Sequence, residues 1–154
     1  MGTRSTEESQ RFRPSSREDQ VVQKAQEHFE RTLISIQGQL AGSVAALESS
    51  YADSELNYGE IFVRDNVPVM IYLLVQGRFA IVKQFLKVCL DLQSTSVQTR
   101  GVFPTSFVEE DGNLVADYGQ RSIGRITSVD PSLWWPILCW ICLLYTSPSP
   151  RDPH

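Results

Sequence analysis

The sequence predicts a mainly α-helical protein with one small β-hairpin. Apolar residues recur every three or four positions over residues 22–40 and 79–92, which is the spacing of amphipathic helices. Two further runs, 67–76 and 131–145, are apolar on nearly every side and short enough to be buried helices. Asp111-Gly112, between two short apolar pairs, is typical of a hairpin turn. The length of 154 residues suits one domain.

The composition is that of an ordinary globular protein, and it argues against several classes of function. Apolar residues make up 42% of the chain and charged residues 21%, with a net charge of −4, so nothing in the charge favours nucleic acid. Only His28 and His154 are histidines, which argues against Ser–His or Cys–His catalysis. Residues 1–16 are polar, lack the apolar core of a secretory signal and are expected to be a disordered tail.

The first helix is expected to begin after Ser16, whose side chain and that of Asp19 form a plausible capping pair. The apolar residues that define its amphipathic pattern are Val22, Ala25, Phe29, Leu33, Ile36 and Leu40. Gly38 and Gly42 are expected to end it, and the Ser-, Asp- and Asn-rich residues 42–57 to form a loop.

A helical hairpin is expected next. Asn66 and Pro68 mark the entry to a short apolar helix over 67–76. Gly77 stops this helix, and a second one follows over 78–93. Since the two are joined at a single glycine, they should pack side by side.

The small β-hairpin is expected around Asp111-Gly112. Phe107-Val108 precedes the turn and Leu114-Val115 follows it, with Glu109, Glu110 and Asp111 at a solvated tip.

The last helix is expected over 131–145. Asp130 reads as its N-cap and Pro131 as its first residue, where a missing N–H costs nothing. A polar, glycine-punctuated loop precedes it, so polar side chains would meet Trp134 and Trp135 at the mouth of the helix. Planar rings beside carboxylate, amide and guanidinium groups suit a carbohydrate. Because neighbouring helical residues point about 100° apart, at most one of the two tryptophans can face a sugar.

Two other interpretations of this last helix are weaker. Cys139 and Cys142 have C-x-x-C spacing but no second pair, so two buried thiols are favoured over a zinc site. The apolar run is interrupted by Pro136 and is too short to span a bilayer.

Three segments together carry a resemblance to a known family. They are Leu56-Asn-Tyr-Gly-Glu-Ile-Phe-Val-Arg-Asp65, Gln98-Thr-Arg-Gly-Val-Phe-Pro-Thr-Ser-Phe107 and Asp117-Tyr-Gly-Gln-Arg-Ser-Ile-Gly-Arg125. In this order and spacing, the chain from about Val21 to Trp140 resembles the N-terminal part of the alkaline/neutral invertases, which are glycoside hydrolases of photosynthetic organisms.

The resemblance implies an (α/α)₆ barrel that hydrolyses sucrose to glucose and fructose with inversion, as a β-fructofuranosidase, without metal or other cofactor. It implies a cytoplasmic location, with an organelle as the alternative, and leaves open whether the full-length form is a homo-oligomer. Residues 17–141 would be the first part of the catalytic domain. Residues 142–154 do not resemble the family and are expected to be an artefactual tail of a truncated product. The general acid and base are expected downstream, so no catalytic residue is assigned and the chain alone should be inactive.

The candidate substrate-binding residues are Arg64, Asp65, Gln120, Arg121, Asp130, Trp134 and Trp135. Each has a structural alternative. Arg64 and Asp65 could form an ion pair that fixes a loop, and Asp130 could serve only as a helix cap. Either tryptophan could be core packing, and Gln120 and Arg121 could simply stabilise their loop.

Two other classes of function stay open besides the glycosidase: a non-catalytic helical interaction module and a small carbohydrate-binding domain. The expected partner is sucrose, with neither nucleic acid nor membrane. As a barrel fragment, the chain should lack partners for Met70, Tyr72, Leu73, Trp135 and Trp140.

Overall fold

The computed structural model of the chain describes residues 16–45, 58–120 and 129–147. The chain divides into two compact units, residues 1–31 and 32–154, and each is considered by itself. The described residues contain four helices and five strands, and about half of these residues are helical, as expected of a mainly α protein. Most of the predicted tail (1–15), most of the predicted loop (46–57) and the end of the chain (148–154) lie outside the described residues.

The first unit contributes helix α1, Arg17–Thr32, whose start confirms the predicted cap. The backbone N–H of Ser16 donates to Asp19 Oδ2 over 3.2 Å, and the N–H of Asp19 donates to Ser16 Oγ over 3.1 Å. These reciprocal bonds form a capping box and satisfy two N–H groups at the helix start. None of the residues of α1 is buried.

The predicted extent of the first helix, to Leu40, was wrong. After Thr32 the chain forms an antiparallel hairpin of β1, Leu33–Ile36, and β2, Gln39–Ser43. Its turn places Gln37 at φ 51° and Gly38 at φ 75°, the left-handed pair that suits a two-residue hairpin. A shift of register between Ile34 and Ser35 leaves Leu33 and Ile36 both buried, three residues apart. This irregular strand therefore imitates helical spacing in the sequence.

A three-stranded antiparallel sheet, with strand order β3-β4-β5, forms the second β element. It comprises β3, Ile61–Phe62, β4, Ser106–Glu110, and β5, Asn113–Asp117. The hairpin between β4 and β5 turns at Asp111 (φ 51°) and Gly112 (φ 77°), which confirms the predicted turn. The strand β3 was not predicted, because its two paired residues are too few to show alternation.

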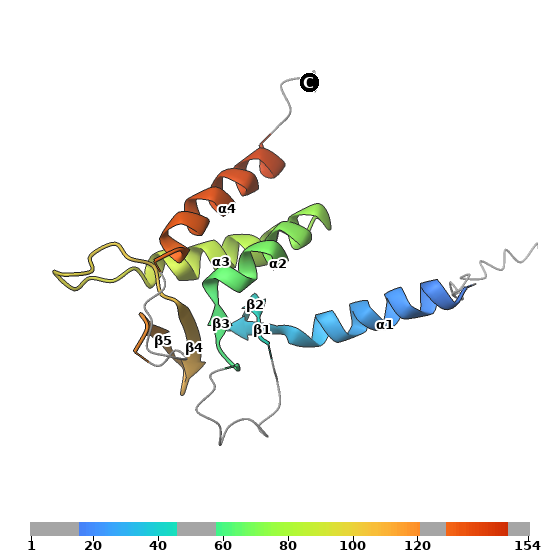
Figure 1. Ribbon diagram of the computed structural model, residues 1–154, viewed down its shortest axis with the longest axis horizontal. Helices are drawn as coiled ribbons and strands as arrows, with labels where there is room; N and C mark the ends of the chain where they lie inside the picture. Colours follow the sequence, from blue (N-terminus) through green and yellow to red (C-terminus); the bar gives the residue numbers. More distant parts are fainter. Residues whose placement is uncertain (1–15, 46–57, 121–128, 148–154) are drawn as a thin grey trace, which may run out of the picture. The chain divides into compact units, whose positions relative to one another are not determined.

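Three helices complete the second unit (Figure 1): α2, Val63–Val75, α3, Phe79–Asp91, and α4, Pro131–Thr146. Gly77, at φ 73°, separates α2 from α3, which confirms the helical hairpin. However, α2 begins directly after β3, so Pro68 lies inside the helix and does not mark its entry. The early start is possible because Phe62, the last residue of β3, has an extended backbone and serves as the N-cap of α2, which begins at Val63.

The core of this unit lies between α2, α3, α4 and the two sheets. Phe85 of α3 and Phe107 of β4 are both fully buried, with ring centroids 6.2 Å apart. Met70 and Leu73 are also fully buried, so the expectation that they would lack partners was wrong: the neighbouring helices and the short sheets already cover them.

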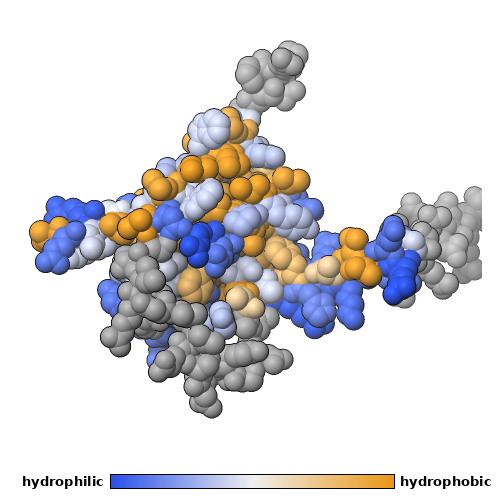
Figure 2. Space-filling model, viewed as in Figure 1, coloured by the Kyte–Doolittle hydropathy of each residue, from blue (hydrophilic) through white to orange (hydrophobic). Residues whose placement is uncertain are grey.

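Helix α4 differs in carrying many exposed apolar side chains, and Figure 2 shows apolar residues gathered over α4 and the helices beside it. Its exposed apolar stripe consists of Leu133, Ile137, Trp140 and Leu144, each between 44% and 65% exposed. These positions are spaced by three or four residues and so share one side of the helix. No helix among the described residues is both long and apolar enough to cross a membrane.

Candidate functional site

Charged side chains from the starts of α2 and α4 form one cluster. Arg64 Nε lies 3.6 Å from Asp65 Oδ1, and Arg64 Nη1 lies 3.4 Å from Asp130 Oδ2. The structure therefore brings together three of the predicted site residues, although Arg64 and Asp130 are 66 residues apart in the sequence. The side chains of Arg64 and Asp65 are more than 60% exposed and that of Asp130 is 30% exposed. Ion pairs this accessible stabilise a fold by only about 0–1 kcal/mol, so all three groups are available to a ligand.

Asp130 does not cap α4 with its side chain, so this part of the prediction was wrong. Its backbone is already helical, at φ −66° and ψ −27°, and its carboxylate makes no capping hydrogen bond. A side-chain cap needs an extended backbone, which would let the oxygen reach the N–H groups of the first turn. Instead the backbone oxygen of Asp130 accepts from Leu133 and Trp134, and the carboxylate faces Arg64.

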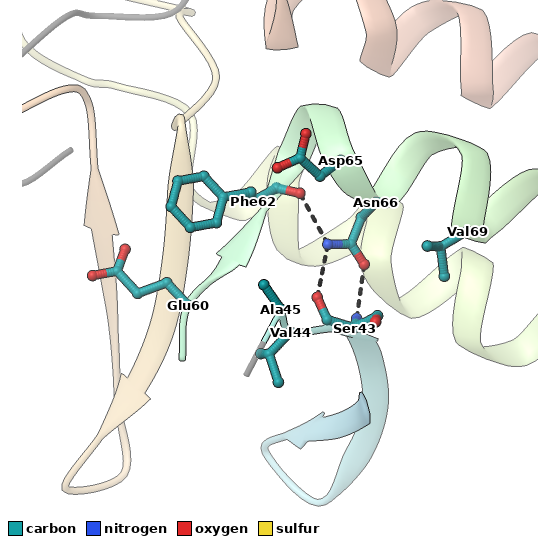
Figure 3. Close-up of a pocket in the computed structure, with 8 residues that line it drawn as sticks. All are labelled: Ser43, Val44, Ala45, Glu60, Phe62, Asp65, Asn66 and Val69. Carbon is teal, nitrogen blue, oxygen red and sulfur yellow. Dashed lines mark hydrogen bonds between the residues drawn. The ribbon is translucent and has the colours of Figure 1, made fainter. Parts of the chain in front are cut away.

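A small pocket lies beside Asp65 (Figure 3). Its volume is about 120 Å³, and its lining comes from the end of β2, from β3 with the residue before it, and from α2. The lining residues are Ser43, Val44, Ala45, Glu60, Phe62, Asp65, Asn66 and Val69. Pockets that enclose small ligands usually measure about 300–1,000 Å³, so the described residues form at most one wall of a sugar site.

Asn66 holds the parts of this pocket together. Its Nδ2 donates to the backbone oxygens of Ser43 and Phe62, both over 2.9 Å, and its Oδ1 accepts from the N–H of Ser43 over 2.7 Å. The side chain is 2% exposed, so these bonds tie β2 to the first turn of α2 without competition from water. The sequence predicts only that Asn66 marks the start of a helix, because its partners Ser43 and Phe62 are identified by the structure alone.

Glu60 is a second lining residue that sequence reasoning missed. It is 7% exposed, and it accepts a hydrogen bond of 2.6 Å from Ser106 Oγ on β4. The available signal was its position directly before the apolar residues of β3, which suggests burial. A buried carboxylate needs a hydrogen-bonding partner, so this position could have indicated a residue such as Ser106.

The two tryptophans divide as the helical geometry requires. Trp135 stacks on Phe103, with ring centroids 4.9 Å apart, and its Nε1 donates to the backbone oxygen of Leu86 over 3.0 Å. Trp134 is 40% exposed. Trp135 therefore packs inward, and Trp134 is the tryptophan that can meet a ligand.

Gln120 lies in the turn that follows β5, and its hydrogen bonds to Asp117 and Tyr118 stay within that turn. Its N–H donates to Asp117 Oδ1 over 2.7 Å, and its own Oε1 accepts from the N–H of Tyr118 over 3.0 Å. The Tyr118 hydroxyl donates to the backbone oxygen of Leu92, and partial burial raises the pKa of this phenol. Arg121 lies outside the described residues.

The part of the chain that the structure describes contains no group of three His, Cys, Asp or Glu side chains placed to hold a metal ion. Cys142 is buried and Cys139 partly buried on α4. Burial raises the pKa of the Cys142 thiol, and the neighbouring Cys139 raises it further. Burial also raises the pKa of the Cys89 thiol in α3. Protonated thiols are poor metal ligands and poor nucleophiles.

Comparison with known proteins identifies the family of the chain. The glycoside hydrolase family described as alkaline and neutral invertase matches residues 25–149. The alkaline/neutral invertase CINV1 of Arabidopsis thaliana is 37% identical over 130 residues, covering 77% of this chain and 23% of its own. Neutral/alkaline invertase 1, mitochondrial, of Oryza sativa subsp. japonica is 39% identical over 125 residues, covering 70% of this chain and 20% of its own.

The match extends across most of the helical second unit and includes both halves of the charged cluster. The family match thus makes the chain a member of a glycoside hydrolase family. The chain belongs to the alkaline and neutral invertases. It spans about a quarter of the length of the curated relatives it matches.

Proposed function

We propose that this chain forms part of a glycosidase that cleaves sucrose to glucose and fructose with inversion, and that its helices are the first of an (α/α)₆ barrel. The observation that carries the proposal is the cluster of Arg64, Asp65 and Asp130 where α2 and α4 begin. In a member of this family, exposed carboxylates and a guanidinium beside an exposed tryptophan are the groups that a sugar requires.

The residues have different proposed roles. Asp65 and Asp130 accept hydrogen bonds from sugar hydroxyls, and Arg64 holds the two carboxylates together and donates to a sugar oxygen. Trp134 supplies a flat apolar face for the C–H groups of the ring. Arg121 adds a further donor to this sugar, whereas Gln120 lines a separate pocket. Further parts of a longer protein would close the remaining sides of the site.

The isolated chain of 154 residues should release no glucose from sucrose. Inversion requires two carboxyl groups about 6.5–9.5 Å apart on opposite faces of an enclosed substrate. The pocket of about 120 Å³ beside Asp65 is too small to enclose one. An enzyme-coupled glucose assay measures this, and turnover that Asp65→Ala abolishes would show that the chain suffices.

In a longer protein that contains this chain, Asp65→Asn should lower kcat/KM for sucrose about 10- to 100-fold, because a charged hydrogen-bond acceptor contributes about 1.5–3 kcal/mol. The melting temperature should barely change, since the carboxylate is 66% exposed. The matched control is Asp111→Asn at the exposed hairpin turn, which should leave both quantities unchanged. An Asp65→Asn protein that melts early but keeps full turnover would reduce Asp65 to a structural role.

Asp130→Asn in the same protein separates binding from catalysis. A substrate contact should mainly raise KM, whereas loss of a proton-transfer group should lower kcat by orders of magnitude at similar KM. The second result would contradict the placement of both catalytic carboxylates downstream. Magnetic resonance of the first sugar released should show inversion, and retention would contradict the mechanism.

We also propose a cytoplasmic location. The names of the relatives support a choice of compartments, since they include a cytosolic, a mitochondrial and a chloroplastic invertase of Oryza sativa subsp. japonica. A fluorescent fusion tests this placement, and accumulation in an organelle would overturn it.

A further inference from the structure

A second, larger pocket lies between the segment that follows α3 and the turn that follows β5. Its volume is about 460 Å³, which is within the usual range for small ligands. The lining residues are Gln93, Ser94, Thr95, Ser96, Gln98, Thr99, Val102, Tyr118 and Gln120. None of them lines the pocket beside Asp65, and none belongs to the Arg64 cluster.

The wall formed by residues 93–102 is held by its own backbone. The N–H of Ser94 donates to the oxygen of Val102 over 2.9 Å, and the N–H of Gly101 donates to the oxygen of Ser94 over 2.8 Å. Between them the hydroxyls of Ser94 and Thr99 share a hydrogen bond of 2.7 Å. A loop closed in this way needs little ordering when a ligand binds, which lowers the entropic cost of binding.

The opposite wall is fixed by a side chain. The hydroxyl of Tyr118 donates to the backbone oxygen of Leu92, at the end of α3, so this contact joins the turn after β5 to the segment after α3. Burial raises the pKa of Tyr118, and the phenol therefore stays neutral at physiological pH.

Some lining groups remain available to a ligand. Within the described part of the chain, the side chains of Thr95 and Gln98 make no hydrogen bond, and both residues are exposed. The Gln98 amide can donate and accept at once, and the Thr95 hydroxyl can do the same. This is the pattern that adjacent hydroxyl groups of a ligand can satisfy.

We propose that this pocket binds a small neutral polyhydroxylated ligand, a sugar, at a second site separate from the Arg64 cluster. Eight of its nine lining residues carry hydroxyl or amide groups and none is charged, so an ionic ligand would find no counter-charge there. An apolar ligand would strip water from these polar groups without replacing their hydrogen bonds. The choice of a sugar among neutral ligands rests on the proposed function.

Saturation-transfer difference magnetic resonance with the full chain and sucrose at millimolar concentration tests the proposal. This measurement detects weak binding and tolerates self-association of the protein. The double variant Thr95→Ala, Gln98→Ala should weaken binding about tenfold, because it removes the two side chains that are available to hydrogen-bond a ligand. The control Val97→Ala changes a neighbouring side chain that is 88% exposed and does not line the pocket, and should bind as the parent does.

Asp65→Asn distinguishes this site from the proposed catalytic site. If the second pocket binds sucrose, Asp65→Asn should keep the affinity that the double variant weakens. If the double variant binds sucrose as tightly as the parent, or no binding is detected, the second site does not exist. Neither result bears on sucrose hydrolysis by a longer protein, which is measured through Asp65 and Asp130.

Discussion

Gly42 shows how closely one residue can be constrained in this fold. It lies in β2 and directly faces Ile61 of β3, a fully buried side chain. A β-carbon built on Gly42 would lie 2.7 Å from Ile61 Cγ2 and 2.8 Å from its Cδ1, well inside van der Waals contact. The small residue therefore permits the two sheets to approach, which is a packing requirement and not the helix stop that the sequence suggested.

Gly42→Ala should destabilise the chain by about 1–3 kcal/mol, because Ile61 is enclosed and can move only by displacing its neighbours. Urea unfolding monitored by tryptophan fluorescence measures the change in unfolding free energy. Gly59→Ala is the matched control, since a β-carbon there meets nothing within 4 Å. Equal stability of the two variants would mean that the sheets can separate at no cost.

At the scale of the element, α4 has an inner side that anchors it to the core and an exposed side that carries the apolar stripe. Trp135 anchors its inner side through stacking on Phe103 and a hydrogen bond to Leu86. Its first turn also contacts the segment that precedes β4, because Ser132 Oγ accepts from the N–H of Phe103 over 3.3 Å. These contacts fix the direction in which α4 begins, and so place Asp130 against Arg64.

Trp135→Phe should lower the unfolding free energy by about 1 kcal/mol through loss of the indole hydrogen bond, and further through the smaller ring. Trp134→Phe should have little effect, because Trp134 is 40% exposed. The difference between the two melting temperatures is the measurement. A larger loss for Trp134→Phe would contradict the assignment of Trp135 to the inward side.

At the scale of the molecule, the buried core and the exposed stripe of α4 coexist in one unit. Met70 and Leu73 have their partners, whereas Trp140 is 62% exposed and Tyr72 is 42% exposed. Burying one large apolar side chain contributes about 1.5–3 kcal/mol, so a stripe of four favours association with another apolar surface.

We expect the isolated chain to be folded but to self-associate with rising concentration and to bind an apolar dye. Sedimentation velocity over a range of concentrations measures the association. Ile137→Lys together with Trp140→Lys should shift the chain towards monomer, whereas Val97→Lys, at an exposed position outside the stripe, should not. A monodisperse monomer of the unmodified chain at every concentration would show that the stripe drives no association.

The elements with strong local signals were predictable from the sequence. The cap at Ser16 and Asp19, the turn at Asp111-Gly112 and the stop at Gly77 all depend on residues a few positions apart. That Trp134 and Trp135 point to different sides also follows from helical geometry, although only the structure shows that Trp135 is the one that packs inward. The three family segments and the residues of the charged cluster could likewise be named without coordinates.

Only the tertiary structure decided the rest. The hairpin of β1 and β2 replaced a predicted helix because an irregular register buries Leu33 and Ile36 at helical spacing, a distinction that local pattern cannot make. The pairing of Arg64 with Asp130 joins positions 66 residues apart. The Asp130 carboxylate faces Arg64 and does not form the helix cap that the neighbouring sequence predicts. Local sequence determines which backbone conformations have a low free energy. Contacts between distant segments determine which of them bury the most apolar surface and leave the fewest polar groups unpaired.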